Sequence, residues 1–167
     1  MELNCLSKNG FLSSKDVAEL TTIPSAERIS KGPVAIIECI QDIPCNPCEA
    51  SCKFGAITIG DDITNTPNFR GDKCTGCGAC IYKCPGLAIF LIDGSREGTM
   101  GSVSFPYEFL PLPVEGQIVD VVNRSGDVIC KGHVEKVSNP KISDHTPVVQ
   151  VEVPKDLLME ARGMKLL

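Results

Sequence analysis

Hydrophobic and polar positions at the start of the chain predict two short helices followed by a strand. Ser14 is placed to cap a helix that runs through about Thr21. Ser25 is placed to cap a second helix. The β-branched run Pro33–Glu38 then predicts a strand. Because both helices are too short to be stable alone, we expect residues 1–33 to form a helical extension.

The middle of the chain contains an internal repeat with an offset of 32 residues. Each copy has a loop, a short turn of helix and a strand, with the strands predicted at Ala56–Ile59 and Ala88–Ile92. Two copies of a unit that cannot bury its own apolar side are expected to pack against each other. The offset aligns Cys45 with Cys77, Cys48 with Cys80, Cys52 with Cys84, Ala56 with Ala88 and Ile57 with Ile89.

After Gly94 the pattern changes to β-branched runs separated by turns. Arg124–Gly126 is a hairpin signal between two such runs. Pro154 is placed to open a short terminal helix over Lys155–Arg162. We therefore place the chain in the α+β class, with a domain at 34–94 and a small antiparallel, β-barrel-like module at 100–167. The strands expected in this module are Gln117–Asn123, Asp127–Lys131, Gly132–Ser138 and Pro147–Val153.

Charge and hydropathy exclude several classes of function. The net charge of −5 and the absence of a basic stripe argue against nucleic-acid binding. The most apolar stretches, Pro33–Ile37 and Leu87–Ile92, are far shorter than the roughly 20 residues that span a bilayer. The first 20 residues lack the apolar run of a signal peptide. We expect a cytoplasmic protein that does not insert into membranes.

Sulfur is concentrated in one part of the chain, because eight of the ten cysteines lie between Cys39 and Cys84. In a reducing cytosol, such density is typical of metal ligands more than of disulfides. Two C-x2-C pairs could hold zinc, but that arrangement would leave Cys80 and Cys84 unused. Cys5 and Cys130 lie outside the cluster and are expected to be ordinary thiols.

The second half of the repeat carries a motif for an iron–sulfur cluster. Residues 74–85 read C-x2-C-x2-C-x3-C-P, the spacing with which bacterial ferredoxins hold 4Fe-4S clusters. Iron in such clusters is bound by soft thiolates. Gly76 and Gly78 permit the tight turn that the spacing requires, because glycine tolerates positive φ. The four cysteines are Cys74, Cys77, Cys80 and Cys84.

The first half of the repeat carries a less regular version of the motif. Cys45, Cys48 and Cys52 keep the x2 and x3 spacings, but Cys39 lies three residues early. The offset places Asp42 opposite Cys74. Three arrangements stay open: Cys39 reaches the iron through a longer loop, Asp42 is the ligand, or the site holds a three-iron cluster. We favour Cys39, because thiolate is the softer donor.

Residues 34–92 resemble a bacterial-type ferredoxin domain with two 4Fe-4S clusters. The resemblance implies a ferredoxin-like fold in which the fourth cysteine of each motif binds the other cluster. It thus implies one cluster on Cys39, Cys45, Cys48 and Cys84, and another on Cys74, Cys77, Cys80 and Cys52. The segments Pro-Ser-Ala-Glu-Arg, Gly-Pro-Val-Ala-Ile-Ile-Glu-Cys and Ile-Pro-Cys-Asn-Pro-Cys also resemble small iron–sulfur subunits of FAD-dependent amino-acid or amine dehydrogenases.

The motifs absent from the chain limit its function. No G-x-G-x-x-G follows a strand and no P-loop is present, so no site for a two-electron substrate is visible. We expect a non-catalytic electron-transfer subunit that forms a hetero-oligomer with an FAD-containing dehydrogenase and passes electrons to an external acceptor. The alternatives are a freely diffusing ferredoxin-type carrier and a structural or redox-sensing module. Candidate docking residues, which equally suit the interior of the β module, are Phe105, Tyr107, Phe109 and Leu110.

Overall fold

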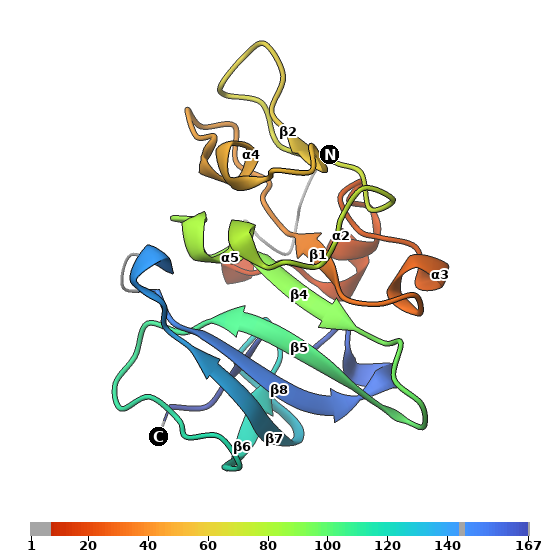
Figure 1. Cartoon of the computed structure of the whole chain (residues 1–167), viewed down its shortest axis with the longest axis vertical. Helices are drawn as coiled ribbons and strands as arrows, with labels where there is room; N and C mark the ends of the chain where they lie inside the picture. The colour runs from red at the N-terminus through yellow and green to blue at the C-terminus, as the bar shows by residue number, and fades with distance from the viewer. Residues whose placement is uncertain (1–7, 144–145, 167) are drawn as a thin grey trace.

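One antiparallel sheet joins the cysteine-rich segment to the C-terminal part of the chain (Figure 1). The computed structural model describes residues 8–143 and 146–166, so Cys5 lies outside the described residues. Within these ranges, seven strands lie in the order β1-β4-β5-β8-β7-β6-β9. They are β1 Val34–Ile37, β4 Ile89–Asp93, β5 Met100–Pro106, β6 Ile118–Val122, β7 Val128–Ser138, β8 Val148–Pro154 and β9 Gly163–Met164.

The two repeats pack against each other through matching elements. The helix of the first copy, α4 (Pro47–Ser51), contacts the helix of the second, α5 (Ala79–Lys83). The strand that follows α4, β2 (Ile57–Thr58), pairs with the strand that precedes the second motif, β3 (Asn68–Phe69). The strand before the first motif, β1, also pairs with the strand after the second motif, β4, with Val34 opposite Ile92. Figure 1 shows α4 and β2 at one end of the molecule, with the strands from β5 onward at the other.

Two short helices lie in the N-terminal segment, and one expected cap was wrong by a residue. The helix α2 spans Ser14–Ala18, and its cap is Ser13 in place of the predicted Ser14. Ser13 Oγ accepts a hydrogen bond from Asp16 N (3.2 Å), while the Asp16 carboxylate accepts one from Ser13 N (2.8 Å). This reciprocal capping box fixes the start of the helix. The expected cap of the second helix, α3 (Ala26–Ile29), is confirmed at Ser25.

The C-terminal strands follow the predicted hairpin but differ elsewhere. The turn after Asn123 is confirmed between β6 and β7. The two strands expected on either side of Lys131–Gly132 form one strand, β7. The expected helix over Lys155–Arg162 is only the 3₁₀ turn η2 (Lys155–Leu157), because Gly163–Met164 continues as β9 beside β6. A second 3₁₀ turn, η1, covers Lys141–Ser143.

The core of the sheet is built from alternate positions of neighbouring strands. Val149, Val151 and Val153 of β8 are each fully buried. Val151 lies between Val103 of β5 and Val134 of β7, which are also fully buried. A side chain that points to the same face recurs every second residue in a strand, so these valines stack into one layer. Each contributes about 1.5–3 kcal/mol by leaving water.

One glycine of β7, Gly132, lies where the neighbouring strands leave no room for a Cβ atom. A Cβ atom on Gly132 would lie 2.4 Å from Val151 Cγ1 and 2.5 Å from Val121 Cγ2. We expect Gly132→Ala to lower the free energy of unfolding by about 1–3 kcal/mol through overpacking. Gly163→Ala is the control, because its Cβ would meet Val122 at an ordinary 3.5 Å. Thermal unfolding of both variants measures the difference, and equal midpoints would contradict the packing argument.

The mixed helix-and-strand class and a large antiparallel sheet are thus confirmed. The ferredoxin-like fold of residues 34–94, the helical extension as a unit and the domain boundaries stay predictions. The sheet passes directly from β4 to β5 across the expected boundary at 94–100. Within the described ranges, no helix has the length and apolar character needed to cross a membrane.

Candidate iron-sulfur sites

Four cysteines surround one small cavity between the first motif and the start of β4. The cavity has a volume of about 30 Å³ and apolar walls that include Ile37, Ile59 and Ile89. Burial, as the largest cause, and the negative charges of three neighbouring cysteines together raise the pKa of Cys48 to about 11. We call these four residues the first cysteine group: Cys39, Cys45, Cys48 and Cys84.

The other four cysteines of the motifs form a second set of electrostatic neighbours. Burial, as the largest cause, and the negative charges of three further cysteines together raise the pKa of Cys80 to about 12. Cys80 is buried, whereas Cys77 is exposed. This second site therefore reaches the protein surface at Cys77. We call the four residues the second cysteine group: Cys52, Cys74, Cys77 and Cys80.

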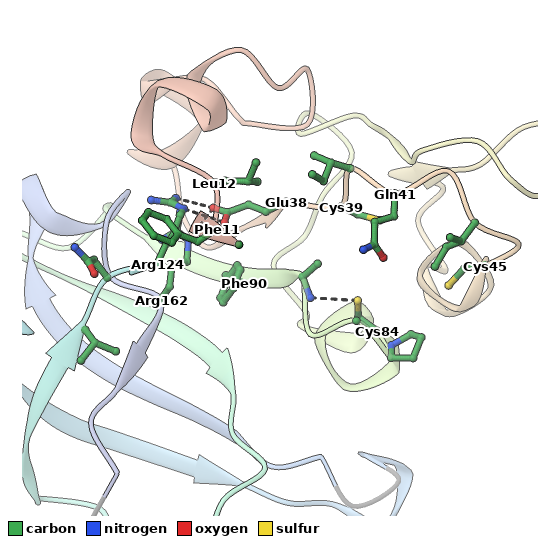
Figure 2. Close-up of a pocket in the computed structure, with 18 residues that line it drawn as sticks. Phe11, Leu12, Glu38, Cys39, Gln41, Cys45, Cys84, Phe90, Arg124 and Arg162 are labelled. Carbon is green, nitrogen blue, oxygen red and sulfur yellow. Dashed lines mark hydrogen bonds and ion pairs between the residues drawn. The ribbon is translucent and has the colours of Figure 1, made fainter. Parts of the chain in front are cut away.

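The last cysteine of each motif lies with the first three of the other motif. Cys52 and Cys84 hold equivalent places in the repeat, and both follow a short helix. Cys52 Sγ accepts a hydrogen bond from Ala56 N (3.3 Å), and Cys84 Sγ accepts one from Ala88 N (3.4 Å). Figure 2 shows the second of these bonds, with Cys39 close by. The structure thus repeats the same N–H···S contact in both copies, and such bonds help to set cluster potentials.

The donor set at both sites fits iron–sulfur clusters. Thiols are the donors, the walls are largely aliphatic, and backbone N–H groups reach the sulfurs. Asp42 is exposed and does not line this cavity, but it lines a neighbouring hollow together with Cys39, Glu19 and Thr66. Among residues 8–143 and 146–166, no three His, Cys, Asp or Glu side chains converge on a position for a single metal ion. A cluster presents several iron atoms to its ligands, so its cysteines do not need to converge on one point as the ligands of a single ion do.

The loop of the second motif has the predicted backbone. Gly76 and Gly78 have φ values of 71° and 75°, as expected from the tight cysteine spacing. A Cβ atom on Gly76 would lie 2.5 Å from the carbonyl oxygen of Pro33. The loop therefore passes directly over the start of β1, where only glycine fits.

Arg28 fixes the same loop, although no sequence pattern indicated this role. Its Nε donates a hydrogen bond to Gly71 O (2.8 Å), and its Nη2 donates to Cys74 O (2.6 Å). Its Nη1 donates to Gly32 O (3.0 Å), next to β1. One side chain from α3 thereby holds the second motif against the first strand. Arg28 lies inside the Pro-Ser-Ala-Glu-Arg segment. The resemblance to small iron–sulfur subunits drew attention to this segment, but not to the role of the arginine.

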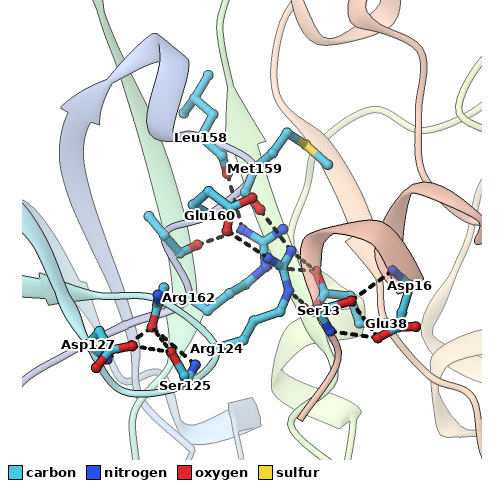
Figure 3. Close-up of polar contacts among 12 residues, drawn as sticks. Ser13, Asp16, Glu38, Arg124, Ser125, Asp127, Leu158, Met159, Glu160 and Arg162 are labelled. Carbon is cyan, nitrogen blue, oxygen red and sulfur yellow. Dashed lines mark hydrogen bonds and ion pairs between the residues drawn. The ribbon is translucent and has the colours of Figure 1, made fainter. Parts of the chain in front are cut away.

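Figure 3 shows a buried ion-pair network around Glu38, whose members line one cavity together with three cysteines of the first group. Glu38, which precedes Cys39, accepts hydrogen bonds from Arg124 Nη2 (2.6 Å) and Arg162 Nε (2.8 Å). Burial alone would raise the pKa of Glu38, but the hydrogen bonds and charges of both arginines lower it below its usual range. The network joins the end of β1 to the hairpin turn and to the C-terminal segment, which sequence reasoning did not foresee.

Comparison with known families agrees with the cysteine geometry. A family model described as "4Fe-4S dicluster domain" matches residues 38–88. The match and the eight cysteines of residues 39–84 identify two 4Fe-4S clusters as the cofactors of this chain. The chain is thus an iron–sulfur protein whose cysteine-rich segment is similar to a 4Fe-4S dicluster domain.

Several curated relatives share this segment. A subunit of the Na(+)-translocating ferredoxin:NAD(+) oxidoreductase complex of Acetobacterium woodii is 40% identical over 50 residues, covering 30% of this chain and 14% of the relative. A subunit of an ion-translocating oxidoreductase complex of Methanosarcina acetivorans is 41% identical over 49 residues, covering 29% and 17%. ABC transporter E family member 1 of Arabidopsis thaliana is 34% identical over 89 residues, covering 47% and 15%.

The chain therefore spans only about a sixth of the length of the curated relatives that it matches. No solved structure matches it. The similarity to an FAD-dependent dehydrogenase subunit has no counterpart among these relatives and stays a prediction.

Proposed function

We propose that the chain is an iron–sulfur subunit that relays single electrons between an FAD-containing dehydrogenase and an external acceptor. The clusters supply reversible one-electron redox chemistry when bound. The observation that carries the proposal is the pairing of the two cysteine groups through α4 and α5, which lie in contact. Two of the relatives are subunits of oxidoreductase complexes, which supports a hetero-oligomer.

The ligand sets follow the two cysteine groups. One cluster is held by Cys39, Cys45, Cys48 and Cys84, and the other by Cys52, Cys74, Cys77 and Cys80. The cavity lined by Cys39 and the exposed position of Asp42 support thiolate ligation over the aspartate. The N–H groups of Ala56 and Ala88 stabilise negative charge on the sulfurs and so favour the reduced clusters.

The different exposure of the two sites supports different places of electron exchange for the two clusters. Cys77 is the exposed member of the second group, so this cluster exchanges electrons at the surface. The first group has no exposed member, since Cys48 is buried and its other three cysteines are partly buried. We assign the second cluster to exchange with one redox partner, while the first receives or delivers electrons next to the larger cavity beside Glu38.

A loop after β5 supports docking of a partner chain. Two of the four candidate docking residues, Phe105 and Tyr107, are buried and belong to the core. The other two are exposed, Phe109 by 56% and Leu110 by 86%. Exposed apolar side chains of this size are typical of interaction surfaces when they lie together. Val114, exposed by 66%, ends the same loop.

Purification from the native host tests the subunit assignment. We expect the tagged full chain to retain an FAD-containing protein, detected by flavin fluorescence of the eluate, and to have no dehydrogenase activity when separated from it. Leu110→Glu should reduce the retained flavin several-fold, because a charge would be buried in the contact. Val128→Glu is the control, since Val128 is exposed by 50% on β7. A chain that always elutes without flavin would favour the freely diffusing carrier.

Redox titration separates electron transfer from a structural or sensing role. Relay clusters should be reduced and reoxidised reversibly, as followed by visible absorbance and electron paramagnetic resonance. Clusters that resist reduction in the physiological range would favour the structural role.

A further inference from the structure

A hollow with a volume of about 190 Å³ lies beside the exposed cysteine of the second group. Its lining combines the loop of the second motif, where Cys77 lies between Gly76 and Gly78, with residues of β5, β7 and β8. The hollow is smaller than the roughly 300–1,000 Å³ of sites that enclose a small molecule. It therefore suits a side chain of a partner protein better than a free cofactor.

One row of residues across the sheet forms much of the wall. Residues directly opposite each other in antiparallel strands lie side by side on one face. Lys136 of β7 is opposite Gln150 of β8, and Gln150 is opposite Ser104 of β5. Ser104 is in turn opposite Leu91 of β4. All four residues line the hollow, and Figure 1 shows their strands as neighbours in the sheet. The strands after residue 94 thus complete a surface around a cysteine of the second motif.

A hydrogen bond fixes this wall to the helix of the second motif. The hydroxyl of Tyr82 in α5 donates it to Ser138 Oγ at the end of β7 (2.8 Å), and both residues line the hollow. The same helix carries Cys80, the buried member of the second group. The bond therefore holds β7, and with it Lys136, in a fixed place relative to the second cysteine group.

The charge that faces the hollow is positive. Among the described residues that line it, Lys136 alone is charged, and it is exposed. Within residues 8–143 and 146–166, its ammonium group pairs with no carboxylate. Two carboxylates of the same strands lie outside the lining: Glu135 pairs with Arg96, and Glu152 is an electrostatic neighbour of that arginine. The hollow is thus a positively charged site on a chain whose net charge is −5.

We propose that the second cluster exchanges electrons at this hollow, which receives an acidic side chain of the redox partner against Lys136. The inference rests on the proposed electron-transfer function and adds the chemistry of the partner's surface, a carboxylate beside the partner's own redox centre. Attraction between such groups raises the rate of association and orients the partner over Cys77.

Two small oxidants of opposite charge test the hollow without an identified partner. The anion cobalt(III)–EDTA and the cation hexaamminecobalt(III) each take one electron from a reduced cluster, so that cobalt(III) becomes cobalt(II) and the cluster returns to its oxidised state. The full chain is reconstituted and reduced anaerobically, mixed with each oxidant at fixed ionic strength, and followed by the recovery of visible absorbance. Lys136→Gln should slow the reaction with the anion about threefold to tenfold and accelerate the reaction with the cation, because one positive charge is lost.

Lys131→Gln is the matched control for net charge. It removes the same charge from the same strand, but about 16 Å along β7 from Lys136, where Lys131 pairs with Asp120. We expect it to leave both rates unchanged. Equal rates in Lys136→Gln and Lys131→Gln would overturn the role of the hollow alone. Clusters that neither oxidant reoxidises would instead overturn the electron-transfer function, and this inference with it.

Two further measurements locate the anion and test the acidic partner. The redox-inert paramagnetic anion hexacyanochromate should broaden the NMR signals of Gln150 and Ser138 in the wild type but not in Lys136→Gln. A capped triglutamate peptide should slow the reaction with cobalt(III)–EDTA by competition, whereas a capped triglutamine peptide should not. Broadening confined to other parts of the surface, or equal effects of the two peptides, would contradict the proposal.

Discussion

Replacement of Cys84 by serine is expected to remove the cluster of the first motif, although Cys84 belongs to the second. Cys84 lines the same cavity as Cys39, Cys45 and Cys48. The iron content should fall from roughly eight to about four atoms per chain. Anaerobic iron and sulfide analysis measures this change, and electron paramagnetic resonance of the reduced variant should retain one cluster signal.

The equivalent change in the first motif, Cys52→Ser, completes the test of the crossed ligand sets. Cys52→Ser should remove the second cluster and leave the first, because Cys52 is an electrostatic neighbour of Cys80. Cys130→Ser is the control and should leave the iron content unchanged, since this partly buried thiol lies in β7. If Cys84→Ser instead lost the cluster of its own motif, the crossed ligand sets would be wrong.

Glu38→Gln is expected to cause a large loss of stability, because it breaks a buried ion-pair network. The side chains of Glu38 and Arg124 are each 7% exposed, and that of Arg162 is 4% exposed. Removal of the shared carboxylate leaves two buried cations, which should lower the free energy of unfolding by about 3–5 kcal/mol. Glu160→Gln should cost about 0–1 kcal/mol, because Glu160 is partly exposed. Thermal unfolding of the loaded protein compares the two, and similar midpoints would contradict the role of the network.

The same carboxylate gives the stability a defined pH dependence. The pKa of Glu38 in the folded protein lies below its ordinary value of 4.5. Its contribution is therefore complete above that ordinary value and is lost as the pH falls through the lowered pKa. Glu38→Gln should lose less stability than the wild type over this acidic range. A parallel decline of the two proteins would show that Glu38 is not responsible.

The cysteine chemistry could be predicted from the sequence because ligand spacing is local. The x2 and x3 intervals separate cysteines that are only a few residues apart, and Gly76 and Gly78 lie beside the cysteines that they position. The repeat offset then relates the second motif to the first. The hairpin after β6 was visible for the same reason, since its turn is a short run of suitable residues.

The network around Glu38 could not be predicted, because its members are far apart in the sequence. Arg124 and Arg162 follow Glu38 by 86 and 124 residues. Before the sheet is known, nothing in the pattern distinguishes these arginines from solvated ones. Arg28 was missed for a similar reason, because its acceptors are backbone carbonyls, which no side-chain pattern records.

The strand β5 was missed because only one of its residues, Val103, is β-branched, and Gly101, Ser102 and Ser104 have low strand propensity. Ser102 and Ser104 alternate with Val103 and Phe105, yet all four are buried. Gln150 Nε2 donates a hydrogen bond to Ser102 Oγ (3.0 Å), so a polar pair occupies the second face. Alternation normally indicates one solvated face. Here it separates an apolar layer from a buried polar one.

The ladder between β4 and β5 has a practical meaning for anyone who wishes to shorten this protein. The two strands pair residue by residue, with Leu91 opposite Ser104, Ile92 opposite Val103 and Asp93 opposite Ser102. A fragment that stopped before β5 would present a bare, apolar strand edge to solvent, and such edges recruit other molecules into fibrils or precipitates. The cysteine-rich segment and the strands from β5 onward are therefore better expressed together as one polypeptide.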